Sequence, residues 1–301
     1  MRDSVPSRTV DELDLHANGI RFRALAAGPA DGPLVLFLHG FPELSTSWLR
    51  QLPAVAGAGF RAVAPDLRGY GQSERRGPYD LETLASDAAG LVQAVRRERA
   101  TIVGHDWGGA IAWMTAIQRP SVVERLVILN APHPALFAGS VGANLRQLVR
   151  FSYVLFFQVP RLPEWLLSRR RAAAIAWSLR RWSRGTSTWL PEQLESYRNA
   201  FADAASTGAA LEYYRALRRR PLARYRAAQA HRIDIPTLIV WGVHDPAFES
   251  QLVSPEKLAR WFARGKEPTV RLIEEAGHFV QNDAPDRVNE ELLAWLDAMQ
   301  A

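Results

Sequence analysis

Short apolar runs alternate along most of this chain with longer stretches in which apolar residues recur every three or four positions. Continuous apolar runs are typical of strands that are covered on both faces, whereas the wider spacing is typical of helices with one buried side. The runs that predict buried strands cover residues 33–38, 61–65, 101–104, 123–129, 236–241 and 269–273. Strands that alternate with helices in this way indicate a parallel sheet with right-handed crossovers.

The first residues follow a different pattern. Val10 to Leu15 alternates between apolar and polar positions, and Ile20 to Leu25 follows the hairpin signal Asn18-Gly19. An antiparallel pair of strands is therefore predicted at the start. Helices are predicted from Ser45 or Thr46 to about Ala56, from Leu81 to Val95 behind an Asp80 cap, after Gly109, and from about Pro285 to Met299.

The alternation of strands and helices stops between Pro134 and Gln229. This segment is rich in arginine and aromatic residues at helical spacing, is interrupted by prolines and holds no convincing strand. We therefore predict an all-helical insertion, 134–229, in a core made of residues 1–133 and 230–301. Because it follows the carboxyl end of a strand, the insertion should cover the sheet edge at which open α/β folds place their sites.

Composition excludes several kinds of chemistry. Of the 301 residues, 48% are hydrophobic and 23% are charged, which is ordinary for a globular protein. The absence of cysteine excludes disulfides, thiolate metal sites and a cysteine nucleophile. The first fourteen residues lack the apolar run of a signal peptide, and no run reaches the roughly 18 to 20 apolar residues of a membrane span. We expect a cytoplasmic protein without an integral membrane segment.

The net charge of +6 is unevenly distributed. Residues 134–229 hold 16 Arg and 5 acidic residues, a net of +11, and the remainder holds 21 basic and 26 acidic residues, a net of −5. Such local basicity favours a solvated arginine-rich surface over nucleic-acid binding, with attraction to an anionic membrane surface or acidic partner as the alternative. No nucleic-acid partner is expected.

The sharpest chemical signal lies where the apolar run at 101–104 meets the next helical stretch. Gly104, Asp106 and Gly108 have the spacing of a nucleophile elbow, a tight strand-to-helix turn whose small flanking residues expose one side chain. Asp106 stands where such turns usually carry serine. A carboxylate at this position favours displacement at saturated carbon, which forms an alkyl-enzyme ester, over acyl transfer.

Asp245 and His278 also directly follow predicted parallel strands. The carboxyl ends of such strands meet at one edge of the sheet. Each residue alone has a simpler explanation, Asp245 as a turn or helix-cap residue and His278 as a structural histidine. Together with Asp106 they follow the order nucleophile, acid, histidine, and we predict that the three form a catalytic triad.

Each partner of Asp106 then has a chemical role. His278 would activate the water that hydrolyses the ester, and Asp245 would hold the imidazole in the required tautomer and stabilise its cation. Hydrolysis builds an oxyanion on the Asp106 carboxyl group, which needs backbone donors. We assign this oxyanion hole to the N–H groups of Phe41 and Trp107.

With these motifs, residues 13–296 resemble the epoxide hydrolases of the α/β-hydrolase superfamily. The resemblance rests on His39-Gly40-Phe41-Pro42-Glu43, on Pro65 to Ser73, on Gly104-His105-Asp106-Trp107-Gly108-Gly109, on Asn130-Ala131-Pro132-His133, on Trp241 to Asp245 and on Gly277-His278. It implies an α/β-hydrolase fold, with a mostly parallel eight-stranded sheet and an inserted all-helical cap.

The resemblance also implies two cap tyrosines that hydrogen-bond the epoxide oxygen and protonate it as the ring opens. Residues 151–160 resemble the first tyrosine motif of this family, which selects Tyr153. Residues 212–215 resemble the second motif, which selects Tyr214, with Tyr213 as the alternative. Either tyrosine could instead be a core aromatic of the helical cap.

Other residues of these motifs are expected to support the structure and not to take part in the reaction. Asp66 and Arg68 are expected to pair within the turn after their strand, whereas His39 and His105 are expected to fix loops. The Phe41–Pro42 bond is a candidate for a cis peptide.

The predicted function is hydrolysis of a small hydrophobic epoxide by water to a vicinal diol, without a cofactor or metal. A haloalkane or haloacid dehalogenase would use the same triad. The haloalkane enzymes have a side-chain donor where this chain has Phe41, and the haloacid enzymes carry arginines where it has Trp107 and Ala110. A non-catalytic binding protein on this scaffold is a further alternative, against which the complete triad counts. Homo-oligomerisation is left open.

Overall fold

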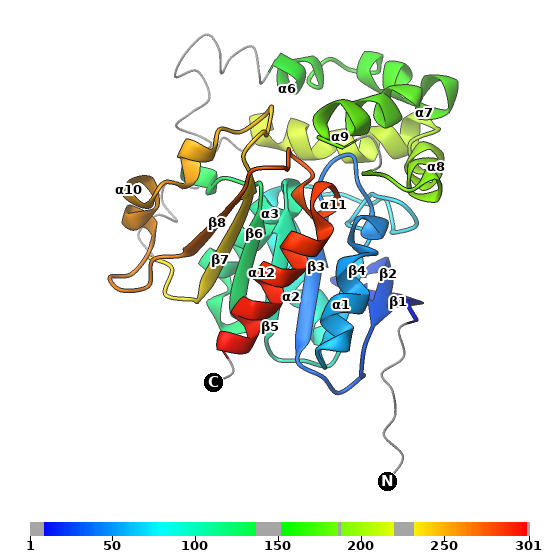
Figure 1. The fold of residues 1–301 in the computed structure, drawn as a ribbon. Helices are drawn as coiled ribbons and strands as arrows, with labels where there is room; N and C mark the ends of the chain where they lie inside the picture. Colours follow the sequence, from blue (N-terminus) through cyan, green and yellow to red (C-terminus); the bar gives the residue numbers. More distant parts are fainter. Residues whose placement is uncertain (1–8, 137–151, 186–187, 220–231, 300–301) are drawn as a thin grey trace.

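The computed structural model describes residues 9–136, 152–185, 188–219 and 232–299. They contain an eight-stranded sheet in the order β1-β2-β4-β3-β5-β6-β7-β8 (Figure 1). The strands are β1 (Asp11–Ala17), β2 (Ile20–Ala27), β3 (Leu34–Leu38), β4 (Arg61–Pro65), β5 (Ala100–His105), β6 (Val123–Leu129), β7 (Thr237–Gly242) and β8 (Thr269–Ile273). The predicted mostly parallel sheet of eight strands is confirmed.

Of the eight strands, β2 alone runs against the others. It pairs antiparallel with β1 and with β4, while β3 to β8 pair in parallel. Asn18 and Gly19 form the β1–β2 turn with positive φ values of 50° and 71°, which matches the predicted hairpin. Because parallel strands end at the same edge, the loops after β3, β5, β6, β7 and β8 gather there.

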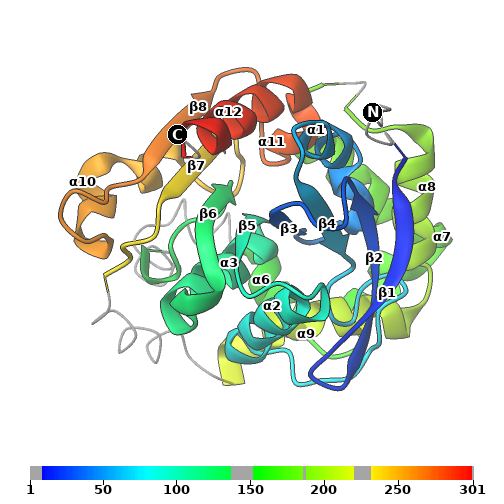
Figure 2. The same cartoon turned by 90° about the horizontal axis from the view of Figure 1, so that it is seen from below.

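Helices cover both faces of the sheet, as the two views in Figures 1 and 2 show. One face carries α1 (Gln51–Gly57), α11 (Val280–Asp283) and α12 (Pro285–Ala298), and the other carries α2 (Leu81–Ala94) and α3 (Trp107–Gln118). Each side has its own buried apolar core. Strands that are covered on both faces explain the continuous apolar runs in the sequence. Shorter turns of helix are η1 (Ser45–Trp48), η2 (Pro120–Val122), η4 (Ser250–Val253), α10 (Pro255–Leu258) and η5 (Ala259–Trp261).

Helix α2 illustrates how the amphipathic pattern is used. The side chain of Asp80 accepts the backbone N–H of Thr83 at 3.2 Å and so caps the first turn, as predicted. Leu84, Ala88 and Leu91 are buried along the side that faces the sheet and α3. The N-cap hydrogen bond and the apolar stripe together hold α2 against the sheet and α3.

The helix predicted over residues 45–56 is wrong in its first half. The chain forms the short turn η1, and the α-helix begins only at Gln51. Pro53 then lies in the first turn of α1, where its missing N–H costs no intrahelical hydrogen bond. If the helix began at Thr46, the same proline would interrupt its interior.

The expected pairing of Asp66 with Arg68 is also wrong. Arg68 donates to both carboxylate oxygens of Asp87 on α2, at 2.6 and 2.7 Å, and both side chains are buried. Asp66 accepts the backbone N–H groups of Ser45 and Gln72 at 2.9 and 3.2 Å. A buried guanidinium needs a carboxylate in bidentate geometry, and only the packing of α2 supplies one.

Four described helices, which we call the cap, lie between β6 and β7 in the chain and above the carboxyl edge of the sheet (Figure 1). They are α6 (Ser152–Phe156), α7 (Leu162–Trp182), α8 (Pro191–Ala200) and α9 (Ala204–Arg219). The helical conformation of α7 is interrupted from Arg169 to Ala172. Residues 137–151, 186–187 and 220–229 of the predicted insertion lie outside the described residues. The helices that are described include none long and apolar enough to cross a bilayer.

Candidate active site

Asp106 occupies the turn between β5 and α3. Its φ of 49° and ψ of −117° lie in a region that residues other than glycine rarely enter. This strained turn is the backbone geometry of a nucleophile elbow, and it directs the carboxylate toward the loops at the sheet edge. The turn predicted from the spacing of Gly104, Asp106 and Gly108 is therefore present.

Two glycines allow the backbone to pack closely around this turn. A Cβ at Gly108 would lie 2.0 Å from the carbonyl oxygen of Leu38, at the end of β3. A Cβ at Gly40 would lie 2.4 Å from the Cβ of Asp106. A side chain at either position would push the loop after β3 away from Asp106.

The loop after β3 brings a backbone donor to the carboxylate. The N–H of Phe41 donates to Oδ1 of Asp106 at 2.9 Å. Trp107 is the first residue of α3, so its N–H has no acceptor within the helix. The peptide bond between Phe41 and Pro42 is cis, as anticipated. One of the two assigned oxyanion donors thus already contacts Asp106.

His278 lies between two carboxylates. Its Nδ1 is 2.9 Å from Oδ2 of Asp245, and its Nε2 is 3.7 Å from Oδ2 of Asp106. The side chains of His278 and Asp245 are buried, and that of Asp106 is 13% exposed. Three residues selected from separate strand ends are therefore neighbours in the fold.

Burial and mutual charge decide the protonation of this group. Burial alone would lower the pKa of His278, but Asp245, and after it Asp106, raise it to about 10. Burial alone would raise the pKa values of Asp106 and Asp245, but the hydrogen bonds and charge of His278 hold both below their usual range. The resting site holds an imidazolium between two carboxylates at neutral pH.

Sequence reasoning gave no role to Asn130, which positions Asp245. The Asn130 Nδ2 donates to Oδ2 of Asp245 at 2.8 Å, and the Oδ1 accepts the N–H of Gly242 at 2.8 Å. Oδ1 of Asp245 accepts the backbone N–H groups of Ala247 and Phe248 at 2.7 and 3.0 Å. The signal that could have indicated Asn130 is its place directly after β6, between the ends of β5 and β7.

Glu43 is a second residue whose role the sequence did not reveal. It is fully buried, and Nδ1 of His105 lies 2.6 Å from its Oε2. Gln281 and Ser47 donate to its Oε1. Nε2 of His105 donates to the carbonyl oxygen of His278 at 2.9 Å, so His105 does fix a loop, as expected. The Glu43 carboxylate joins the loop after β3 to the end of β5 and to the loop that carries His278.

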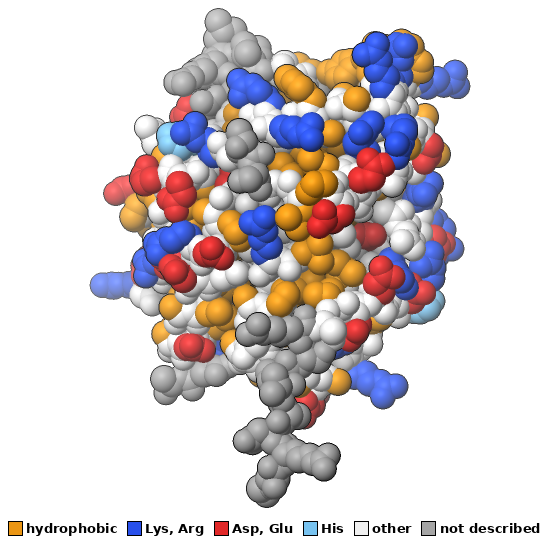
Figure 3. Space-filling view, turned by 45° about the vertical axis from the view of Figure 1, so that its right-hand side comes forward, with side chains coloured by type: hydrophobic (Ala, Val, Ile, Leu, Met, Phe, Trp, Pro, Cys, Tyr) orange, Lys and Arg blue, Asp and Glu red, His pale blue; other side chains and the backbone are white. Residues whose placement is uncertain are grey.

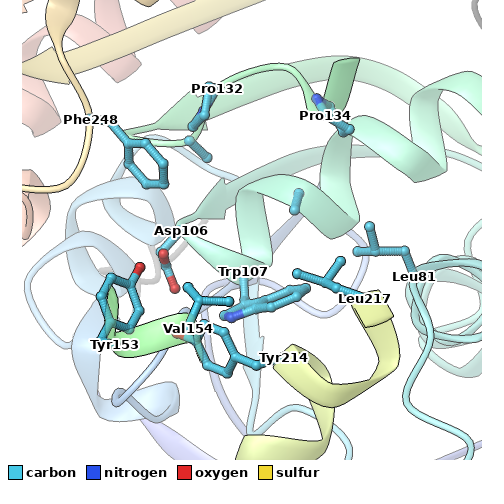
Figure 4. A pocket seen from close by; sticks show the side chains of 12 residues that line it. Leu81, Asp106, Trp107, Pro132, Pro134, Tyr153, Val154, Tyr214, Leu217 and Phe248 are labelled. Atoms are coloured by element: carbon cyan, nitrogen blue, oxygen red, sulfur yellow. The ribbon is translucent and has the colours of Figure 1, made fainter. Parts of the chain in front are cut away.

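An apolar pocket opens beside Asp106, between the cap and α3 (Figure 4). The pocket together with the open space at its mouth measures about 570 Å³. The lining includes Trp107, Tyr153, Val154, Tyr214, Leu217 and Phe248. The predicted triad carboxylate and both predicted cap tyrosines therefore face one cavity.

Tyr153 and Tyr214 stand around the carboxylate of Asp106. Figure 4 shows the hydroxyl end of Tyr153 turned toward Asp106. The ring of Tyr214 packs edge-on against Trp107, with centroids 5.1 Å apart. Burial, and then the charge of Asp106, raises the pKa of both phenols well above the usual value. Both tyrosines therefore stay protonated at neutral pH.

The structure separates Tyr214 from its neighbour Tyr213. The hydroxyl of Tyr213 donates to the carbonyl oxygen of Arg68 at 2.7 Å, and the side chain is fully buried. Tyr213 does not line the pocket, whereas Tyr214 does. Of the two adjacent tyrosines that the sequence left open, Tyr214 is therefore the one at the pocket.

Comparison with known proteins agrees with this geometry. The sequence profile of the α/β hydrolase fold matches residues 33–285. The chain belongs to the α/β-hydrolase family. This α/β hydrolase is 33% identical over 287 residues to epoxide hydrolase 4 of Mus musculus, an alignment that covers 93% of this chain and 77% of that protein.

Two bacterial proteins are similar over almost their whole length. Epoxide hydrolase A of Mycobacterium tuberculosis is 31% identical over 317 residues, covering 94% of this chain and 96% of that one. The crystal structure of a Bacillus megaterium epoxide hydrolase with an inhibitor has a TM-score of 0.82 and 26% identity, and the match covers 95% of this chain and 100% of that one. The resemblance to the epoxide hydrolase family that the motifs predicted is confirmed.

The contacts around the elbow predict the effect of one methyl group. Gly108→Ala would place its Cβ against the backbone of Leu38, so we expect the free energy of unfolding to fall by about 1–3 kcal/mol. Gly57→Ala is the matched control, because a Cβ there meets no atom within 4 Å. Urea denaturation of both variants measures the difference, and equal midpoints would contradict the proposed packing.

Proposed function

We propose that this α/β hydrolase converts an epoxide and water to a vicinal diol through an ester on Asp106. The observation that carries the proposal is the pocket in which Asp106 faces two protonated phenols, Tyr153 and Tyr214. A carboxylate supplies a nucleophile for saturated carbon, and a phenol supplies the proton that a poor alkoxide leaving group needs. The similarity to epoxide hydrolases over 90% or more of the chain supports the same reaction.

The first step forms the ester. Because the Phe41 N–H holds Oδ1 of Asp106, Oδ2 is the attacking oxygen. It forms a bond to one epoxide carbon as the ring C–O bond opposite to it breaks. The ring oxygen takes a proton from Tyr153 or Tyr214 and becomes a hydroxyl group. One phenolate and one ester are left.

The second step releases the diol. His278 restores the phenol with its proton, a transfer that ester formation favours because Asp106 no longer contributes a negative charge beside the ring. Neutral His278 then removes a proton from water, and the hydroxide attacks Cγ of Asp106. The backbone N–H groups of Phe41 and Trp107 would stabilise the resulting oxyanion. Collapse breaks the ester C–O bond, and the departing alkoxide takes the proton of the new carboxylic acid and leaves as the diol. The site then again holds the Asp106 carboxylate, the imidazolium and both phenols.

The lining of the pocket supports a hydrophobic substrate. Val154, Leu217 and Phe248 offer apolar surface, and the polar groups are concentrated around Asp106. A small hydrophobic epoxide could bury its substituent there while its oxygen meets the tyrosines. Protein side chains supply every proton transfer and the nucleophile, so the reaction requires no cofactor.

The source of the first oxygen tests the covalent route. In a single turnover in oxygen-18 water, with enzyme in excess over styrene oxide, the new hydroxyl oxygen should come unlabelled from Asp106. Repeated turnover should then introduce label through the hydrolysed ester. Mass spectrometry of the diol measures both. Labelled diol in the first turnover would contradict the route through Asp106, and release of halide from haloalkanes without diol formation would favour a dehalogenase.

The two pocket tyrosines should affect ring opening and their neighbour should not. We expect Tyr153→Phe and Tyr214→Phe each to slow ester formation by about 10- to 1000-fold, because the leaving oxygen loses a proton donor. Tyr213→Phe is the control, since its hydroxyl bonds to Arg68 outside the pocket. Stopped-flow fluorescence with excess enzyme measures the rate. A loss in Tyr213→Phe that equals the loss in Tyr214→Phe would contradict the assignment.

Loss of the charge on Asp106 should lower the pKa of His278. The parent value of about 10 depends partly on the Asp106 carboxylate, so Asp106→Asn should bring the pKa of His278 down. In the parent, ester formation also removes the charge of Asp106 and so lowers the pKa of His278. The rate of ester hydrolysis should therefore rise as the pH rises through this lowered pKa, because only neutral His278 activates water. NMR titration of the parent and the variant measures the first effect. An unchanged pKa would show that Asp106 does not set the charge of His278.

A further inference from the structure

The outer surface of the cap exposes an unusual share of apolar side chains. Eight large hydrophobic side chains are exposed in the described part of the chain, and six of them lie between residues 155 and 177. These six are Leu155, Val159, Leu162, Trp165, Leu166 and Trp177. Such a concentration on one segment indicates a contact surface, because scattered single residues would be the ordinary pattern.

Packing within the cap does not require these side chains. The second half of α7 buries Ile175, Ala176 and Leu179 against the rest of the protein. Trp177 lies on the other side of the same turn and is 65% exposed. Leu162, Trp165 and Leu166 have the spacing of one helix face in the first half. Both halves of α7, on either side of the interruption at Arg169 to Ala172, therefore expose large apolar side chains to solvent.

The same segment is strongly basic. Residues 161–184 contain seven arginines and one acidic residue, Glu164, which is already paired with Arg215 at 2.7 Å. The guanidinium of Arg169 lies 4.2 Å from the ring centre of Trp165. Within the described residues, no acidic side chain pairs with the exposed arginines at 161, 169, 170, 180 and 181. In Figure 3 basic and hydrophobic side chains lie side by side at the upper right, over α7.

We propose that this outer cap face, made of Leu162, Trp165, Leu166 and Trp177 with the arginines beside them, docks on an anionic phospholipid surface. Tryptophan and leucine suit the boundary between headgroups and acyl chains, and arginines suit phosphate groups. A second copy of this chain fits less well, because a two-fold contact would set unpaired arginines against one another. Residues 134–229 have a net charge of +11, and the rest of the chain has a net charge of −5. This asymmetry favours an approach to a negatively charged surface with the cap in front.

The contact would connect the membrane to the pocket. Tyr153 and Val154 of α6 line the pocket, and the next residue, Leu155, is 62% exposed. One short helix thus contributes both to the cavity and to the exposed apolar surface of the cap. A hydrophobic epoxide dissolved in the bilayer could then enter the pocket without crossing bulk water. The entry of an epoxide from the bilayer rests on the proposed function, whereas the docking itself does not.

Co-flotation of the full chain with lipid vesicles tests the proposal. We expect binding to vesicles with about one third phosphatidylserine, little binding to phosphatidylcholine alone, and release at about 0.5 M salt. The Asp106→Asn variant should bind as the parent does. Retained docking by a parent protein that hydrolyses no epoxide would therefore count against the proposed function alone. No binding by the folded parent would overturn the docking proposal alone.

Paired variants locate the surface. Arg180→Gln with Arg181→Gln should weaken binding about 25-fold, or about fivefold for each arginine. Trp165→Ser with Trp177→Ser should weaken it about tenfold or more. The controls are Arg264→Gln with Lys266→Gln, which remove the same charge from an exposed loop, and Leu272→Ser, which removes an exposed apolar residue elsewhere. Binding of each control should stay within about twofold of the parent.

Two further outcomes would overturn the proposal. One is a loss of vesicle binding in the controls that equals the loss in the cap variants, because charge anywhere on the protein would then suffice. The other is a dimer in analytical ultracentrifugation that Trp165→Ser with Trp177→Ser dissociates, because the face would then be covered by a second copy. An unchanged rate on a water-soluble epoxide in the cap variants verifies that their pockets are intact.

Discussion

The backbone turn at Asp106 is the constraint on which the rest of the site depends. A non-glycine residue holds a positive φ there only because the surrounding backbone leaves no alternative. Glycine at positions 40 and 108 lets the loop after β3 approach closely enough for the Phe41 N–H to reach the carboxylate. β5 lies between β3 and β6 in the sheet, so the loops of both neighbours flank the elbow. The strained turn and its place in the strand order together put Asp106 at the centre of the site.

Compensation of buried charge is the second requirement of this arrangement. A carboxylate removed from water without partners costs several kcal/mol, and this edge of the sheet buries Glu43 and Asp245 almost completely. Asp245 receives hydrogen bonds from Asn130, His278 and two backbone N–H groups, while Glu43 receives them from His105 and neighbouring polar side chains. The same contacts that make burial tolerable also hold His278 protonated and oriented. Stability and chemistry therefore depend on one set of hydrogen bonds.

The parts of the site that sequence patterns could reach are those with a local signature. Glycine spacing identified the elbow, and polar residues after apolar runs identified Asp245 and His278, because both signals depend on residues close together in the chain. The role of Asn130 was missed, since an amide after a strand has no distinctive spacing. The pairing of Arg68 was wrong because its partner, Asp87, lies a helix away in sequence. Tyr213 and Tyr214 are adjacent, so only the orientation of α9 assigns one to Arg68 and the other to the pocket.

The sequence by itself predicted the layered α/β architecture and the turn at Asp106, and it selected Asp245 and His278 as the partners of Asp106. These follow from short-range periodicity and from backbone sterics, which a few neighbouring residues control. Only the tertiary structure decided which of the adjacent phenols lines the pocket, which carboxylates lie beside His278, and which apolar side chains of α7 stay exposed. Those outcomes depend on distances and burial between segments far apart in the chain. No local pattern encodes such distances, because packing of the whole sheet and cap produces them.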